Sequence, residues 1–265
     1  MPADVDLDLL VPTRDARRLA AAPGEPDLVA LLTRPRDRRH VRANMVASVD
    51  GGATGGDGRS GSLGTPADRR VFAVLRALAD VVLVGAGTVR AEGYRELPVV
   101  ADLRAVRAAA GLAPVIELAV VTRRGAVPRD LLTGDRRPLV VTGAAGADRA
   151  RADVGADRLL AVPGTDDPDS PDLRAALDVL AARGLHHALA EGGPRLLADL
   201  LAADVVDELC LTTSPVLLAG GAPRPAVGAV PLDPPRGAHL QHLLHAADGT
   251  LLACWDLRAP VGSGT

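Results

Sequence analysis

Several residue types are scarce or missing in this chain, and each absence narrows what the protein can do. Its 265 residues include no lysine, so all 30 strongly basic side chains are arginines, and Schiff-base lysine chemistry is excluded. Its aromatic residues are Phe72, Tyr94 and Trp255, too few for the stacking platforms that bind single-stranded nucleic acids. Cys210 and Cys254 do not form a Cys-x-x-Cys pair and are expected to be buried thiols in a reducing compartment.

Charge and apolar content set further bounds. The net charge of -3 argues against a nucleic-acid-binding surface, which needs a concentrated basic stripe. The first residues do not join a basic region to a long apolar run, and no uncharged stretch reaches transmembrane length. With 48% hydrophobic residues, the chain can bury one generous core. The sequence predicts a soluble cytoplasmic protein with neither a nucleic-acid nor a membrane partner.

Three apolar segments run directly into polar or glycine-rich turns, in residues 42–51, 81–89 and 188–197. Glycine lets the backbone approach a ligand closely, and the N–H groups at a helix start attract anions. The repetition therefore indicates a site for a phosphorylated cofactor. The turn Gly85-Ala86-Gly87 is similar to the dinucleotide fingerprint, but Arg90 stands where the third glycine belongs. A plain strand-to-helix turn remains the alternative there.

Together these segments resemble a known family. Met45–Gly51, Leu75–Asp80 leading into Gly85–Val89, and Glu191–Gly193 occur in the order and spacing of the reductase domain of bacterial RibD, a riboflavin-biosynthesis family. The zinc deaminase signature of full-length RibD, His-x-Glu with Pro-Cys-x-x-Cys, does not occur. The resemblance covers residues 40–258, which it implies to be a stand-alone reductase domain. It says nothing of residues 1–39, which are expected to be an N-terminal extension, and it leaves 259–265 as a C-terminal tail.

The hydrophobic pattern independently predicts an α/β domain. Thr65, Pro66 and Asp68 form an N-cap, a first helical position and a capping-box carboxylate. A first strand is expected from residue 41 into the Ser-x-Asp-Gly turn at 48–51. Further strands are expected at 81–84, 115–122, 138–142, 159–162, 187–191 and 207–213, with helices near 66–79, 99–110, 170–183 and 194–203. This alternation is typical of a mainly parallel mixed sheet flanked by helices. The resemblance specifies a single dihydrofolate-reductase-like domain.

The two ends of the chain break this alternation. Residues 239–245 and 250–258 are joined by Asp248-Gly249, which predicts a C-terminal antiparallel hairpin. Residues 1–39 show only short helical patches, such as 28–32, and are expected to pack on the main domain. Relatives dimerise through sheet-edge and C-terminal elements, and the hairpin would otherwise leave an exposed edge, so a homodimer is expected.

The resemblance implies NADPH as the cofactor, held at its pyrophosphate by the second and third glycine turns. Arg123 and Arg124 follow a strand where the adenosine end would lie, and guanidinium groups suit a 2′-phosphate. A solvated turn is the alternative for this pair. The expected cofactor-binding residues are Ala47, Ser62, Gly85, Ala86, Gly87, Thr88, Glu92, Thr122, Arg123, Gly192, Gly193, Pro194, Arg195, Leu196 and Leu197.

On the substrate side, Ser60, Arg76 and Glu191 match family positions that touch a ribosylaminopyrimidine, and Asp50, Glu191 and Asn44 are the catalytic candidates. Each has a structural alternative: Arg76 can cover apolar surface with its stem, Asp50 can stabilise a turn, and Glu191 can cap the glycine turn or pair with an arginine. Asn44 stands where many relatives have lysine.

Two other features bear on ligands. The family typically has Asp-Asp-Pro followed by a phosphate-binding arginine after the second glycine turn, and this chain does not. Either Arg95 replaces that arginine or the substrate lacks the phosphate. His239, His242 and His245 cannot all share one face of a strand, so no metal site is expected.

The leading hypothesis is an NADPH-dependent reductase of 5-amino-6-(5-phosphoribosylamino)uracil, forming the ribitylamino product in riboflavin biosynthesis. Hydride would reach the sugar C1′ of the ring-opened, imine-like form. One alternative keeps the fold and cofactor but changes the substrate to a pterin, a dihydrofolate-like compound or another small cyclic imine. Another alternative is a nucleotide-binding protein without catalysis.

Overall fold

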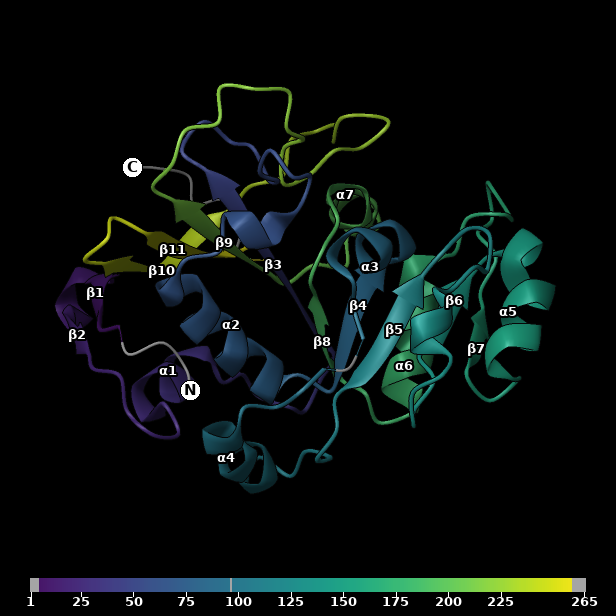
Figure 1. Cartoon of the computed structure of the whole chain (residues 1–265), viewed down its shortest axis with the longest axis horizontal. Coiled ribbons are helices and arrows are strands. Elements are labelled where there is room, and N and C mark those ends of the chain that lie inside the picture. Colours follow the sequence, from purple (N-terminus) through teal and green to yellow (C-terminus); the bar gives the residue numbers. More distant parts are fainter. Residues whose placement is uncertain (1–4, 96, 259–265) are drawn as a thin grey trace.

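A mixed β-sheet runs through residues 5–95 and 97–258, the part of the chain that this computed structural model describes (Figure 1). Eleven strands of these residues follow the order β2-β1-β10-β11-β9-β3-β8-β4-β5-β6-β7. Their bounds are β1 Leu7–Val11, β2 Arg17–Leu19, β3 His40–Ser48, β4 Val81–Gly85, β5 Glu117–Val121, β6 Leu139–Thr142, β7 Leu159–Ala161, β8 His187–Ala190, β9 Glu208–Ser214, β10 His239–Ala246 and β11 Leu251–Asp256. The predicted tail, 259–265, lies outside the described residues.

The sheet has a parallel half and an antiparallel half. Strands β9, β3, β8, β4, β5, β6 and β7 pair in parallel, whereas β11, β10, β1 and β2 continue the sheet from β9 with antiparallel pairs. The expected mainly parallel mixed sheet and the C-terminal hairpin, β10 with β11, are both confirmed. The outermost strands, β2 and β7, have three residues each.

Helices cover both faces of the sheet (Figure 1). The helices are α1 Pro26–Leu32, α2 Pro66–Leu78, α3 Ala86–Glu92, α4 Arg104–Ala109, α5 Ala147–Val154, α6 Leu173–Ala182 and α7 Pro194–Ala202. Helices α1, α2 and α5 contribute to a core on one face, and α6 and α7 contribute to a core on the other. Short 3-10 turns lie at Thr13–Asp15, Ser60–Ser62, Ala101–Leu103, Arg129–Leu131 and Ala144–Gly146.

Helix α2 begins as its sequence predicts. Thr65 has an extended backbone, and its hydroxyl accepts from the Asp68 N–H at 3.2 Å, with Pro66 at the first helical position. The capping-box role of the Asp68 carboxylate is wrong, because this group instead accepts the Thr212 hydroxyl. Helix α5 was not predicted, and the helix expected near 99–110 is regular only from Arg104.

The N-terminal extension is part of the sheet and not only a set of helical patches. Strand β1 pairs with β10, and β2 pairs with β1, so the expectation of a hairpin with an exposed edge is wrong. The predicted helical patch at 28–32 is confirmed by α1. Arg70 of α2 is fully buried and binds Glu25, with Nε–Oε1 at 2.7 Å and Nη2–Oε2 at 2.5 Å. It also donates to the carbonyls of Val5, Leu19 and Ala20.

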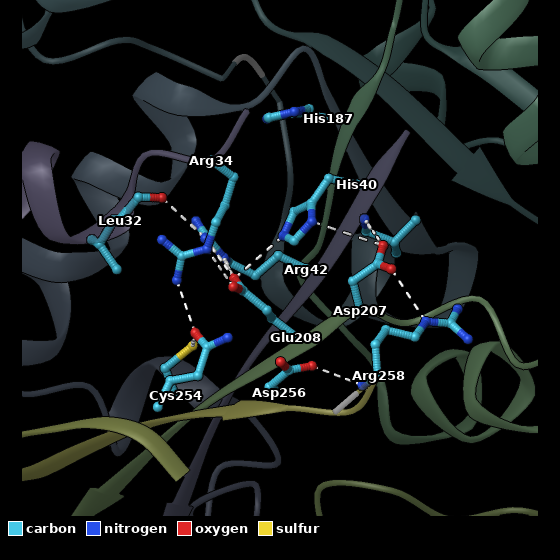
Figure 2. A network of polar contacts seen from close by, with 12 residues as sticks. Leu32, Arg34, His40, Arg42, His187, Asp207, Glu208, Cys254, Asp256 and Arg258 are labelled. Atoms are coloured by element: carbon cyan, nitrogen blue, oxygen red, sulfur yellow. Dashed lines mark hydrogen bonds and ion pairs between the residues drawn. The ribbon is translucent and has the colours of Figure 1, made fainter. Parts of the chain in front are cut away.

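A second polar network ties the end of the extension to the amino ends of β3 and β9 (Figure 2). Glu208 accepts from Arg34 Nε at 2.5 Å and from Arg42 Nε at 2.6 Å, and Arg34 also donates to Gln241. Burial alone would raise the pKa of Glu208, but hydrogen bonding with His40 and the charges of Arg42 and Arg34 hold it well below its usual range. Glu208 therefore stays ionised in a largely buried site.

The two cysteines lie opposite each other on β9 and β11. Cys210 and Cys254 are both buried and not disulfide-bonded, which confirms the expectation of buried thiols. Among the described residues, no helix is both long and apolar enough to cross a membrane.

Candidate functional site

One large cavity opens where the parallel strands β3, β4, β5 and β8 end, and it is lined from both sides of the sheet. Its volume is about 1670 Å³. A site for one small ligand usually has roughly 300–1,000 Å³, so this cavity has room for two ligands side by side. Ligands collect at the carboxyl ends of parallel strands, where loops meet at one edge of the sheet.

The two downstream glycine turns contact each other at the centre of the cavity wall. The Gly85 N–H donates to the Gly192 carbonyl at 3.1 Å, and the Gly192–Gly193 peptide bond is cis. A Cβ at Gly193 would lie 2.5 Å from Thr88 Oγ1, whereas a Cβ at Gly87 would have no atom within 4 Å. The backbone of Gly87 is therefore open to the cavity and to any ligand in it.

Glu191 lies between these glycine turns and α2, and its side chain is almost fully buried at 1% exposure. Both carboxylate oxygens bind Arg76, at 2.6 Å to Nε and 2.6 Å to Nη2, and Tyr94 donates its hydroxyl at 2.7 Å. Burial alone would lower the pKa of Arg76, but the hydrogen bonds and charge of Glu191 raise it. Burial is the main cause of a raised pKa for Tyr94, and the charge of Glu191 and its hydrogen bond with the hydroxyl raise this pKa further. This pairing with arginine is the structural alternative foreseen for Glu191.

The glycine-rich loop of residues 51–63 is attached to the end of α3. Glu92 Oε1 accepts from the Ser60 N–H at 2.7 Å and from its hydroxyl at 2.8 Å. Ser60 and Glu92 both line the cavity, but their polar groups bind each other. Ser62 instead donates to the Arg59 carbonyl and to Asp57.

Asp50 is part of a turn. It accepts the Ser48 hydroxyl at 2.6 Å and the backbone N–H of Ala219 at 2.7 Å and Leu218 at 3.2 Å. These hydrogen bonds lower its pKa to about 2. Its side chain holds the loop after β9 beside the turn after β3, and it does not line the cavity. The geometry favours the turn role over the catalytic one.

A cluster of arginines lies at the end of the cavity beyond β5. Arg123, Arg124 and Arg149 all line this end. Arg123 binds Ser170 at 2.8 Å through Nε and Asp167 at 2.9 Å through Nη2. Arg124 is exposed, and its guanidinium makes no hydrogen bond or ion pair within the described part of the chain.

The cavity brings together most, but not all, of the residues predicted from sequence. The predicted residues that line it are Asn44, Ser60, Arg76, Gly85, Ala86, Gly87, Thr88, Glu92, Thr122, Arg123, Glu191, Gly192, Gly193, Pro194, Arg195 and Leu196. Ala47, Asp50, Ser62 and Leu197 do not line it. Ala47 and Leu197 are buried in the core instead, at 5% and 1% exposure.

Sequence reasoning expected Arg76 at a ligand but did not place its helix neighbours Asp68 and Phe72 in the cavity wall. Asp68, Phe72 and Arg76 follow each other at intervals of four residues on α2, and all three line the cavity, so they share one face of the helix. The Arg76 guanidinium lies 4.3 Å from the centre of the Phe72 ring and 5.9 Å from that of Tyr94. The four-residue spacing was visible in the sequence, whereas the helical face that meets the cavity was not.

Arg95 reaches the cavity mouth. Its side chain is 78% exposed, and its ion pair with Asp130 is long, at 3.7 Å. No group of three or more potential metal ligands occurs among the residues that the structure describes.

Comparisons with known proteins agree with this geometry. Residues 39–252 match the family described as the RibD C-terminal domain. The chain is 30% identical over 185 residues to the 2,5-diamino-6-ribosylamino-4(3H)-pyrimidinone 5′-phosphate reductase of Archaeoglobus fulgidus, a match that covers 69% of this chain and 83% of that one.

Solved structures show the same fold. A pyrimidine reductase-like protein from Corynebacterium diphtheriae superposes with a TM-score of 0.71 at 24% identity, covering 84% of this chain and 93% of that chain. RibD from Acinetobacter baumannii gives a TM-score of 0.65 at 19% identity over 83% of this chain, but over only 58% of its own length. The chain belongs to the RibD C-terminal domain family.

Proposed function

We propose that this protein, an oxidoreductase of the pyrimidine reductase type by its family, reduces a pyrimidine ribosylamine 5′-phosphate with NADPH. The observation that carries the proposal is one continuous cavity shared by the two glycine turns and the α2 face. A reductase of this kind needs the cofactor and the substrate to lie in contact, since hydride passes directly between them.

The residues present fit NADPH. Gly87 leaves the backbone of the second glycine turn open to a pyrophosphate, and Gly193 precedes α7, whose first N–H groups suit an anion. Arg124, with Arg123 beside it, would bind the 2′-phosphate. When bound, NADPH supplies a hydride to the sugar C1′.

The α2 side of the cavity would hold the substrate. Reduction breaks the π bond between C1′ and the exocyclic nitrogen of the ring-opened imine, as hydride adds to C1′ and a proton adds to the nitrogen, giving a ribitylamine and NADP⁺. Asn44 lines this part of the cavity, where its amide can bind the sugar or the exocyclic nitrogen. The Arg76–Glu191 pair would hold the cavity wall fixed where the cofactor and substrate regions meet.

The ribosylamine phosphate would reach Arg95, whose guanidinium is exposed at the cavity mouth and only weakly held by Asp130. The arginine that the family usually places nearby is missing here, and Arg95 offers the same bidentate chemistry. Cys210 and Cys254 are buried and not bonded to each other in a disulfide, which supports the reducing cytosol as the location of the protein.

We also propose that the protein is a homodimer joined through the open face of its antiparallel half-sheet. Leu240 lies opposite Trp255, and Leu243 opposite Ala253, on neighbouring strands. All four side chains are only half-buried, and none belongs to the two cores. Apolar surface of this kind favours a second copy of the chain.

The function is tested by following NADPH oxidation with the purified protein and a freshly prepared ribosylaminopyrimidine phosphate. We expect consumption of one NADPH per ribitylamine formed. NADH should bind more weakly, because loss of a charge-assisted hydrogen bond costs about 1.5–3 kcal/mol. NADPH that binds but is not oxidised by any imine would support the non-catalytic alternative. Equal affinity for NADPH and NADH would contradict the assignment of Arg123 and Arg124 to the 2′-phosphate.

A further inference from the structure

Cys210 and Cys254 are two nucleophilic side chains that the proposed reductase mechanism does not use. They belong to the core that α1 and α2 cover, and so they lie on the opposite side of the sheet from the face assigned to the dimer. Cys210 is 6% exposed and Cys254 is 0% exposed. Their positions in the sheet determine what they can do together.

The two cysteines occupy opposite positions on β9 and β11, as direct partners in the antiparallel register. Just beyond the ends of these strands, the Leu257 N–H donates to the Asp207 carbonyl at 2.9 Å, so residues 207 and 257 are a hydrogen-bonded pair. Hydrogen-bonded and non-hydrogen-bonded pairs alternate along an antiparallel ladder. Cys210 and Cys254 are therefore a non-hydrogen-bonded pair, the kind whose side chains approach each other more closely.

This geometry suits a covalent bond between the two sulfur atoms. The Cα atoms of a non-hydrogen-bonded pair lie about 4.5 Å apart, and disulfides usually span Cα distances of about 4.4–6.8 Å. A disulfide can therefore form here with little movement of the backbone. It would lie at the short end of this range, where strain makes the bond easier to reduce, so the link would be reversible.

The surroundings of the pair favour a thiolate at Cys210. Arg42 of β3 is in register with Glu208 of β9, and Glu208 and Cys210 share one face of the strand, so the guanidinium lies on the side of the thiol. The hydrogen bond with Cys254 is the main cause of a lowered pKa for Cys210, and the charge of Arg42 also lowers it. Burial and the charge of Glu208 oppose this shift of the Cys210 pKa.

The second thiol behaves differently. Its hydrogen bond with Cys210 and its burial both raise the pKa of Cys254. Because the thiolate is the reactive form of cysteine, Cys210 is the nucleophile of the pair, and Cys254 is the thiol that responds to it.

Cys210 lies one strand away from the cavity wall. Its neighbour in register on β3 is Asn44, which lines the cavity, and adjacent strands are about 4.8 Å apart. A molecule in the cavity comes nearer to Cys210 than to Cys254, which lies one strand further on. The burial of both thiols excludes bulky oxidants such as oxidised glutathione, and favours hydrogen peroxide, which is little larger than water.

We propose that Cys210 and Cys254 are a site of reversible oxidation by hydrogen peroxide, which joins β9 to β11 through a disulfide. The Cys210 thiolate attacks one peroxide oxygen, the O–O bond breaks, hydroxide leaves, and Cys210 becomes a sulfenic acid. The Cys254 sulfur then attacks the Cys210 sulfur, the S–O bond breaks, and the oxygen leaves as water with the Cys254 proton. The proton given up by Cys210 converts the hydroxide to water, so the two thiols lose two electrons and one peroxide becomes two waters.

The disulfide would fix the junction between the two halves of the sheet. Strand β9 pairs in parallel with β3 and antiparallel with β11, so it is the strand at which the halves meet. Disulfides in reducing compartments are usually transient and catalytic or redox-sensing. This inference goes beyond the proposed reductase function and does not depend on it: a failed NADPH assay would leave the thiol chemistry standing, and a failed thiol assay would leave the reductase standing.

The test treats the reduced full-length protein with hydrogen peroxide and stops the reaction with catalase. We expect the folded protein to lose both thiols, its mass to fall by two hydrogen atoms, and dithiothreitol to restore both thiols. Trypsin cleaves after Arg236, which lies between the two cysteines, so the disulfide should appear as two peptides joined until reduction. Thiols that survive peroxide in the folded protein, or oxygen added to either cysteine without a cross-link, would overturn the proposal.

Two single variants test the roles of the thiols. Cys254→Ser keeps the attacking thiol without its partner, so oxidation should stop at a sulfenic acid that dimedone captures. Cys210→Ser should react with peroxide at least about tenfold more slowly than Cys254→Ser, because the raised pKa of Cys254 leaves less thiolate. Equal rates for the two variants would overturn the assignment of Cys210 as the nucleophile.

A displaced pair is the matched control for the geometry. In the double variant Leu252→Cys, Cys254→Ala, the second thiol moves along the same face of β11 to a position opposite Thr212, diagonal to Cys210. Leu252 is 5% exposed, so the thiol stays buried. Diagonal neighbours are roughly 7–8 Å apart, which is beyond the usual span of a disulfide.

This control should cross-link at least about tenfold more slowly than the wild type, because the backbone must move before the sulfur atoms can meet. Circular dichroism before oxidation shows that each variant is folded. Cross-linking of the displaced pair at the wild-type rate would mean that the register of β9 and β11 does not govern the reaction, and would overturn the proposal.

Discussion

At the scale of single residues, the Glu191–Arg76 pair is where packing and chemistry are most closely joined. Its carboxylate is 1% exposed and its guanidinium 21% exposed. We expect Glu191→Gln to lower the free energy of unfolding by about 3–5 kcal/mol, since removal of one partner leaves a buried charge uncompensated. Urea unfolding measures this. Because a well-packed apolar pair can replace a buried ion pair, the double variant Glu191→Leu, Arg76→Met should recover much of the loss.

The single variant Glu191→Gln also tests whether Glu191 has a role in catalysis. If Glu191→Gln unfolds at the wild-type midpoint but has a lower kcat with unchanged NADPH affinity, then Glu191 acts on the substrate and its pairing with Arg76 is secondary.

Gly87 separates ligand binding from folding. Its backbone is not in the left-handed region, and an added Cβ meets no protein atom within 4 Å, so Gly87→Val should fold with a melting temperature close to that of the wild type. The branched side chain would occupy the space of the pyrophosphate, and NADPH binding should be lost. Gly134→Val, also at an open position but away from the cavity, is the control. Normal NADPH affinity of Gly87→Val would make this turn purely structural.

Asp68 should make stability depend on pH in a defined direction. Its pKa is raised in the folded protein, so the folded state holds this proton more tightly than the unfolded state does. Its contribution to stability is therefore favourable in acid and is lost as pH rises from about 4, the ordinary aspartate value. Asp68→Asn should match the wild type in urea unfolding near pH 3 and exceed it at pH 7. A variant less stable at pH 7 would contradict this.

At the scale of elements, the N-terminal extension is expected to stabilise the whole domain. Glu25, which precedes α1, is 1% exposed and binds the fully buried Arg70 of α2. Glu25→Gln should cost about 3–5 kcal/mol of unfolding free energy within a single cooperative transition. Asp15→Asn is a surface control, since Asp15 is 53% exposed, and should change it by no more than about 0.5 kcal/mol. A wild-type midpoint for Glu25→Gln would mean that the extension is dispensable.

The strands and helices between residues 40 and 258 were largely predictable, because apolar residues recur along most of them at the spacing of a strand or a helix. Strands β1 and β2 were not predictable from the sequence. Arg17 and Arg18 interrupt the alternation of apolar and polar residues in β2, and β10, with which β1 pairs, lies more than 200 residues away in the sequence. Helix α5 buries only Ala150 and Val154, which is too little apolar content to stand out.

In the candidate site, too, the features that could be predicted were those that a short stretch of sequence specifies. Glycine turns are local signals, so the wall around Gly85 and Gly192 could be predicted. The environment of Asp68 could not, because it depends on Thr212, 144 residues further along the chain. Local capping chemistry suggested a different use for the same side chain.

At the scale of the whole molecule, the proposed dimer can be followed with one native probe. Trp255, the single tryptophan of the chain, lies on the face assigned to the interface. Sedimentation should give twice the 27.1 kDa chain mass. Leu243→Arg should give a monomer whose tryptophan emission shifts to the red, because the indole becomes more hydrated. Val230→Arg, at a position 77% exposed outside this face, should remain dimeric, and a wild-type monomer at micromolar concentration would refute the dimer.

The three-residue strands at the two margins of the sheet have a consequence for behaviour in concentrated solution. An open sheet can recruit further chains through unpaired backbone groups, and long flat margins are the usual starting point of fibrous aggregates. Here β2 and β7 expose few such groups. Arg17 and Arg18 also place positive charge on β2, so two chains that approached each other edge to edge at β2 would repel. The sheet therefore offers little backbone for adding further strands, because it ends at both margins in strands too short to template another.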